Sequence, residues 1–185
     1  MKRYPSIKYL PLALVAAAAL ASNAQAATQA VSFNSLSATA TLPTPFLVGD
    51  NLVLNTLVTQ AIGALTQTIT FSVGAGVTGL VGDAVWQIGT AIGSGPRLTG
   101  VNIDIFNSAN TLVVSDTFIG ALGGFGVSSF ASSITPGTYR LVATGNGIRD
   151  SVLDVSVSFV PEPETYLLML AGIGMVGFMA RRRAS

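Results

Sequence analysis

The chain has 185 residues, enough for one domain of ordinary size, and contains neither cysteine nor histidine. These absences exclude disulfides, cysteine nucleophiles, Ser-His-Asp triads and zinc sites built on Cys or His. The formal net charge is +1, but residues 27–160 hold three arginines against six aspartates, a net charge of −3, and no lysine. A domain of this charge lacks the basic surface that binds nucleic acid.

Residues 1–26 have the three features of a secretory signal peptide. An apolar run, Leu10–Leu20, follows a positively charged start, and Ala24-Gln25-Ala26 supplies the small residues of an A-x-A cleavage site. The positive charges of the start are Lys2, Arg3 and Lys8. We expect the Sec machinery to export the chain and signal peptidase to cut after Ala26, which would leave Ala27 as the new N-terminus.

Residues 27–160 show the two-residue periodicity of strands with one buried face and one wet face. Apolar and polar residues alternate most clearly over 68–73, 101–105 and 155–159. The other strand candidates are rich in β-branched and apolar residues: Val31–Thr41, Phe46–Thr59, Val85–Thr90, Thr111–Phe118, Gly126–Ala131 and Gly137–Thr144. About eight or nine short strands separated by turn residues predict a single antiparallel β-sandwich, of jelly-roll or immunoglobulin-like type.

Several local predictions accompany this fold. Turns are expected at Gly74–Gly82, Gly120–Gly124 and Gly145–Gly147, where turn-forming residues cluster. Pro136-Gly137 suits the centre of a type II turn, which would direct Tyr139, Leu141 and Ala143 into the core. Helical spacing over 55–65 is an alternative that Gly63 weakens.

Paired aspartates are the candidates for chemistry, because two carboxylates can hydrolyse glycans by acid–base catalysis. Asp150 and Asp154 would share a strand face, and Asp104 and Asp116 would face each other across a hairpin. Aspartates near turns more often cap those turns, and aspartates on strands more often lie on the solvent-facing side. We therefore expect no enzyme activity. The sequence contains no Asp-x-Asp-x-Asp loop of the kind that binds Ca²⁺. Gly-x-Gly-x-x-Gly occurs at 74–79, but no βαβ unit follows it, so it does not indicate a dinucleotide site. We therefore expect neither a metal nor a cofactor.

Trp86 is the only tryptophan and the one candidate for stacking against a sugar. A single tryptophan in an apolar strand is more often part of the core. A carbohydrate-binding module therefore remains an alternative, and it requires that Trp86 be exposed in a shallow groove.

Residues 161–185 consist of three parts in a fixed order. Pro161-Glu162-Pro163 ends the preceding strand, because proline removes a backbone donor and fixes φ. Residues 166–180 are uncharged and apolar, and we expect them to form a transmembrane helix about 22 Å long, short against a hydrocarbon core of about 30 Å. A basic stop follows: Arg181, Arg182 and Arg183.

This order resembles the PEP-CTERM sorting signal of Gram-negative bacteria, which combines a Pro-Glu-Pro tripeptide, a hydrophobic helix rich in Gly and Ala, and a terminal arginine cluster. The whole layout is similar to the FxDxF-type group of these proteins, although Ala64-Leu65-Thr66-Gln67 stands before the strand over 68–73. The resemblance implies recognition by an exosortase, a membrane-embedded cysteine protease that would cut near the tripeptide. The residues concerned would be Pro161, Glu162 and Pro163.

Positive charge at both ends of the chain fixes its orientation, because such charge stays in the cytoplasm. The middle of the chain would then lie across the inner membrane, anchored there until processing. The family resemblance implies release or re-anchoring at the cell surface, in association with exopolysaccharide or biofilm. We therefore expect an exported, non-enzymatic surface or matrix protein, with three domains of the chain at 1–26, 27–160 and 161–185.

Overall fold

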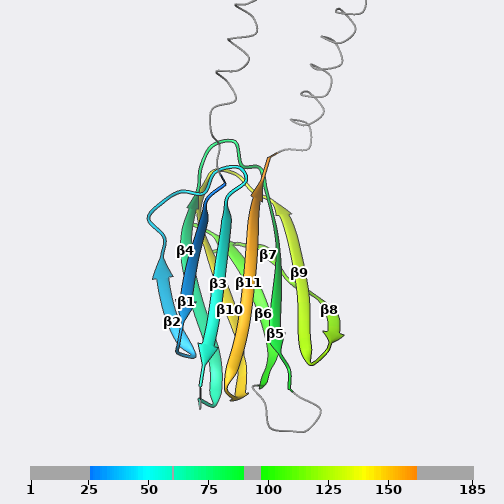
Figure 1. Cartoon of the computed structure of the whole chain (residues 1–185). Helices are drawn as coiled ribbons and strands as arrows, with labels where there is room; N and C mark the ends of the chain where they lie inside the picture. Colours follow the sequence, from blue (N-terminus) through cyan, green and yellow to red (C-terminus); the bar gives the residue numbers. More distant parts are fainter. Residues whose placement is uncertain (1–25, 60, 90–96, 162–185) are drawn as a thin grey trace, which may run out of the picture.

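The computed structural model describes residues 26–59, 61–89 and 97–161, which form two β-sheets packed face to face (Figure 1). One sheet, called sheet A, has the strand order β1 (Thr28–Phe33), β3 (Asn51–Val58), β11 (Ser151–Val160), β5 (Gly79–Gln87), β9 (Phe125–Ser133) and β8 (Thr117–Leu122). Sheet B has the order β2 (Ser37–Thr41), β4 (Gly63–Val73), β10 (Gly137–Arg149), β6 (Arg97–Asn107) and β7 (Leu112–Ser115). The described residues are thus all-β, as predicted, and none of them forms a helix suited to crossing a bilayer.

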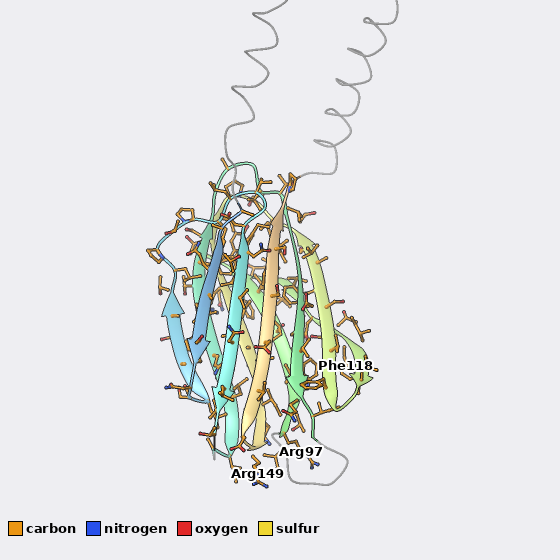
Figure 2. The ribbon with its side chains drawn as sticks, in the orientation of Figure 1. Arg97, Phe118 and Arg149 are labelled. Atoms are coloured by element: carbon orange, nitrogen blue, oxygen red, sulfur yellow. The ribbon has the colours of Figure 1, made fainter. Side chains whose placement is uncertain are left out.

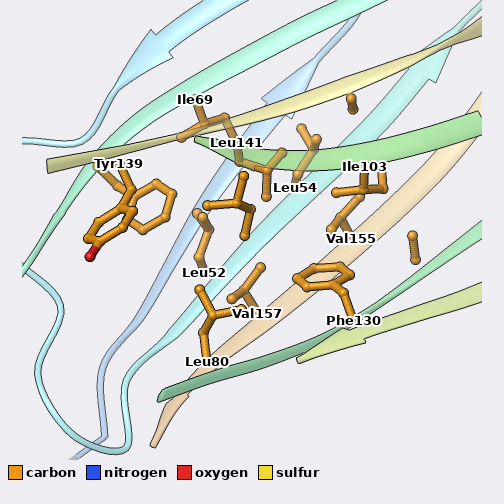
Figure 3. Close-up of a cluster of buried hydrophobic side chains, with 14 of the residues drawn as sticks. Leu52, Leu54, Ile69, Leu80, Ile103, Phe130, Tyr139, Leu141, Val155 and Val157 are labelled. Atoms are coloured by element: carbon orange, nitrogen blue, oxygen red, sulfur yellow. The ribbon is translucent and has the colours of Figure 1, made fainter. Parts of the chain in front are cut away.

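The core lies between the sheets and is built from the inward faces of the central strands (Figure 3). The predicted alternation over 68–73 and 155–159 is confirmed, because every second side chain of β4 and β11 is buried. Tyr139, Leu141 and Ala143 of β10 also face the core, as predicted. Period-two patterning therefore located the buried faces correctly, because side chains of a strand point alternately to its two faces.

The N-terminal strands differ from the prediction. The single strand expected at Val31–Thr41 is divided into β1 and β2, which belong to different sheets. Each pairs in parallel, β1 with β3 and β2 with β4, so the sandwich is not wholly antiparallel. The crossing is stabilised by Gln67, a buried side chain whose Nε2 donates to the carbonyl of Ser35 at 2.8 Å and whose Oε1 accepts from Thr56 at 2.6 Å.

Two predicted glycine turns lie partly or wholly within strands. Residues 74–78 connect β4 and β5, as predicted, but Gly79–Gly82 and Gly145–Gly147 belong to strands. Gly82 belongs to β5, where a Cβ atom would lie 2.4 Å from the Phe130 ring and 2.6 Å from the Ser156 carbonyl oxygen. Glycine is present there because neighbouring groups occupy the space of a side chain, not because the chain turns. Gly145–Gly147 likewise continues β10, with register shifts on the β6 side that mark irregular pairing.

Two further local predictions are wrong, and one alternative is excluded. Residues 55–58 and 63–65 belong to β3 and β4, so the helical alternative fails. The strand expected at Thr111–Phe118 is interrupted at Asp116, whose Oδ1 accepts from the Ile103 amide at 2.9 Å. Gly137 lacks the positive φ that a type II turn requires. The Tyr139 hydroxyl supports that corner instead, donating to the Thr135 carbonyl at 2.7 Å.

Candidate functional site

The first and last described residues of the domain emerge at the same end of the sandwich (Figure 1). β1 and β11 are both neighbours of β3, and β11 runs antiparallel to it, so β1 begins where β11 ends. The loop before β3 forms hydrogen bonds both to the residue that precedes β1 and to the end of β11. The Asn51 amide donates to the Ala27 carbonyl at 2.8 Å, and the Gly49 amide donates to the Phe159 carbonyl at 2.8 Å. The predicted signal-cleavage site and the predicted sorting tripeptide therefore adjoin one end of the domain.

No spacer separates the core from the start of the sorting tripeptide. Phe159 is fully buried and stacks against Phe46 with ring centroids 4.4 Å apart. The next residue, Val160, is still paired with Gly79, and its carbonyl accepts from the Thr78 amide at 3.1 Å. Pro161 follows directly and lacks the N–H that would continue the ladder. Strand pairing of the described residues therefore extends to Val160, and Pro161 is the first residue beyond it.

A depression of about 760 Å³ adjoins this exit. Val160 and Pro161 line it, together with residues 78–81 at the start of β5 and 131–136 at the end of β9. Its lining combines apolar and hydroxyl side chains and contains no charged residue. The surface next to the tripeptide is therefore neutral and recessed.

Asp50 is a functional candidate that sequence reasoning missed. Its side chain is buried, with 6% of its surface exposed. Oδ1 accepts from the Ala27 backbone nitrogen at 2.7 Å, and Oδ2 accepts from the Leu47 amide at 2.7 Å. The sequence placed Asp50 inside the strand candidate Phe46–Thr59, whereas β3 begins only at Asn51. The role of Asp50 was not predictable because its partner, Ala27, is far away in the sequence.

Trp86 is not available for ligand stacking, which corrects its assignment as a possible ligand contact. Only 4% of its surface is exposed, and Phe118 of the edge strand β8 (Figure 2) lies against its ring at a centroid distance of 5.7 Å. A Cβ atom on Gly126 would lie 2.4 Å from the indole, so the ring packs directly on backbone. The carbohydrate-binding alternative required an exposed Trp86, and that requirement is not met.

The four aspartates of the predicted pairs lie in different surroundings. Asp116 binds the backbone of β6, as described above, while Asp104 lies opposite Ser115. Asp154 lies on the outer face of sheet A opposite Asn55, where partial desolvation by neighbouring groups raises the pKa of its carboxyl. Asp150 lies in the connection to β11, and its carbonyl accepts from the Arg97 amide. Among the described residues, no three potential metal ligands cluster.

The remaining predicted site residues lie outside the described residues. They are Ala24 of the cleavage site, Glu162 and Pro163 of the tripeptide, and Arg181, Arg182 and Arg183 of the basic stop. The same holds for the predicted transmembrane helix at 166–180.

Comparisons with known proteins address the fold and the C-terminal motif separately. No curated protein matches the chain. Among solved structures, the fold is similar to the pre-peptidase C-terminal domain of collagenase from Bacillus anthracis, at 13% identity and a TM-score of 0.36, over 74% of this chain and 99% of that one. A similarity this low says nothing about function.

Residues 159–183 match the PEP-CTERM protein-sorting motif, from Phe159 in β11 through the arginine cluster. The match confirms the resemblance identified from the tripeptide, the apolar run and the arginines, and it does not address the FxDxF-type group. The chain therefore carries a PEP-CTERM protein-sorting motif, which implies export and membrane-anchored processing by an exosortase toward the cell surface.

Proposed function

We propose that this is a non-enzymatic protein of the cell surface or extracellular matrix, delivered there by exosortase cleavage in or near the Pro161-Glu162-Pro163 tripeptide. The observation that carries the proposal is the direct join between the core and the motif. Phe159 is both the first residue of the motif match and a fully buried core residue. Cleavage just beyond Pro161 would therefore free the complete sandwich without removing any of its paired strands.

The surface of the domain supports a role in a polysaccharide matrix of the exopolysaccharide or biofilm type. The outer face of β3 and β11 carries neutral amides and hydroxyls, including Asn51, Asn55, Ser156 and Ser158, beside the single carboxylate of Asp154. Ser158 donates to Asn51 at 2.6 Å, so part of this face is a preformed hydrogen-bonding surface. Neutral donors and acceptors of this kind suit hydroxyl-rich polymers, because neither partner carries a charge to be desolvated.

The decisive experiment replaces Pro161, Glu162 and Pro163 together by alanine in the native host. The intact mass of the protein is then measured separately in the membrane and culture fractions. We expect the wild-type chain to end near Pro161 and the variant to extend to Ser185 in the membrane. The motif is the only element of the variant that has changed, so loss of processing would be assigned to it.

A matched control uses the second Pro-x-Pro element of the chain, Pro43-Thr44-Pro45. Replacing Pro43 and Pro45 by alanine also removes two prolines at the same end of the sandwich, next to Phe46, but leaves the tripeptide unchanged. This control is expected to be processed like the wild type. Normal processing of the variant at 161–163 would refute recognition through the tripeptide, and added mass on the wild-type product would identify a new anchor.

A further inference from the structure

We propose that Asp50 is the binding site for the α-ammonium group that signal peptidase creates at Ala27. Signal cleavage would then complete the sandwich with a buried ion pair between Asp50 and the mature N-terminus. The inference rests on the cleavage after Ala26 that the proposed export pathway includes. It is independent of what the exosortase does at the other end of the chain.

The geometry of the pair already exists in the uncleaved chain. Asp50 Oδ1 lies 2.7 Å from the Ala27 nitrogen, which is an amide before cleavage and an ammonium after it. The Asn51 amide holds the Ala27 carbonyl at 2.8 Å, and β1 starts at the next residue in register with β3. The new charge would therefore appear at hydrogen-bond distance from the carboxylate, with no rearrangement of the backbone.

Charge balance points to the same partner. A buried carboxylate is costly unless it is paired, and hydrogen bonds to charged groups are stronger than neutral ones. The arginines of the described residues lie elsewhere: Arg97 and Arg149 are at the opposite end (Figure 2), and Arg140 contacts Asn110 and the Phe106 ring. The mature N-terminus is thus the cation within reach of Asp50 in the described part of the chain.

The solvent exposure of Ala27 makes this pairing favourable. The carboxylate is buried, but Ala27 itself is exposed. The ammonium can therefore donate one hydrogen to Asp50 and keep water on its other two. Such a one-sided arrangement avoids most of the desolvation cost that makes fully buried ion pairs poor contributors to stability.

The pair would also act on the far end of the chain. The Asp50 carbonyl accepts from the Phe159 amide at 3.0 Å, and the neighbouring Gly49 amide donates to the Phe159 carbonyl. The loop that would bind the new N-terminus is therefore the loop that holds the last strand beside the sorting tripeptide. Signal cleavage would tighten the strand end from which Pro161 leaves the domain.

The test compares four forms of the full chain, exported in a bacterium that lacks an exosortase so that the tail remains. They are the wild type, a form with one alanine inserted between Ala26 and Ala27, the Asp50→Asn variant, and the combination. The insertion preserves Ala24-Gln25-Ala26, so cleavage still follows Ala26. It moves the ammonium one residue away while Ala27 keeps an amide that can bind Asp50. The intact mass of each form establishes its N-terminus.

Urea unfolding is followed by the fluorescence of buried Trp86. We expect the insertion to lower the ratio of folded to unfolded protein about tenfold when residue 50 is Asp, equivalent to about 1.4 kcal/mol. It should change the ratio less than about twofold when residue 50 is Asn, because the charge partner is gone. An equal effect in both backgrounds, or a mature N-terminus other than Ala27, would overturn the proposal.

A second measurement decides the question even if Asp50→Asn fails to fold. The two lysines of the chain, Lys2 and Lys8, are removed with the signal peptide, so the α-amine is the only primary amine of the mature protein. An ion pair raises the pKa of an amine and lowers its reactive fraction near neutral pH. The wild type should react with an amine-specific reagent about tenfold more slowly than the insertion form. Equal rates would refute the pair.

Discussion

Replacing Phe159 by alanine removes the side chain through which the sorting motif is joined to the core. Phe159 is fully buried, stacks on Phe46 and lies 5.7 Å from the Phe71 ring. Truncating a buried phenylalanine costs about 3–5 kcal/mol, which combines lost transfer free energy with the cavity left behind. Because the aromatic neighbours lose a stacking partner as well, we expect about 4 kcal/mol for Phe159→Ala.

Urea unfolding monitored by Trp86 fluorescence measures this loss. With a denaturant slope of about 2 kcal/mol/M, the midpoint should fall by about 2 M. Val160→Ala is the matched control on the next residue, which is half-buried, and it should cost less than about 1 kcal/mol. Phe159→Leu keeps most of the apolar volume and should lie between them. The reasoning is refuted if Phe159→Ala costs no more than Val160→Ala.

Two further predictions concern polar side chains of sheet A. Thr56→Val leaves the buried Gln67 Oε1 without its hydrogen bond and should cost about 1–3 kcal/mol in urea unfolding; the exposed Thr66→Val is its control, and equal losses would contradict the prediction. Because partial burial raises the pKa of Asp154 above 3.8, the folded state holds the proton more tightly, and ionisation weakens the fold as pH rises from about 4. Asp154→Asn should therefore stabilise the folded domain slightly near pH 7 and have no such effect near pH 3, with Asp83→Asn as the control. A gain in stability that appeared only at low pH would contradict the prediction.

The strand periodicity was predictable because it is a local property. Side chains over 68–73 and 155–159 alternate in polarity, and a strand can bury such a pattern on only one face. The sorting motif was predictable for a similar reason, since its three parts are contiguous in the sequence. Both signals are complete within a window of a few to about 25 residues.

The features that sequence reasoning missed depend on partners distant in the chain. Gln67 stabilises the crossing between β1 and β2 by bonding Ser35 and Thr56, and nothing near residues 34–36 indicates that partnership. Gly82 was interpreted as a turn residue because glycine permits both sharp turns and close packing, and only the position of Phe130 decides between them. Asp50 is a further case, since its carboxylate binds Ala27.

The central position of β11 determines how the domain would bear mechanical load. β11 is paired along eight residues with β3 on one side and along eight residues with β5 on the other. A pull at Pro161 enters this strand along its axis, perpendicular to the hydrogen bonds of both antiparallel ladders. The bonds are then loaded in shear, and many must break together before the strand moves. A sandwich held through this end would resist extraction by flow or by the drag of an attached polymer far better than one held through an edge strand.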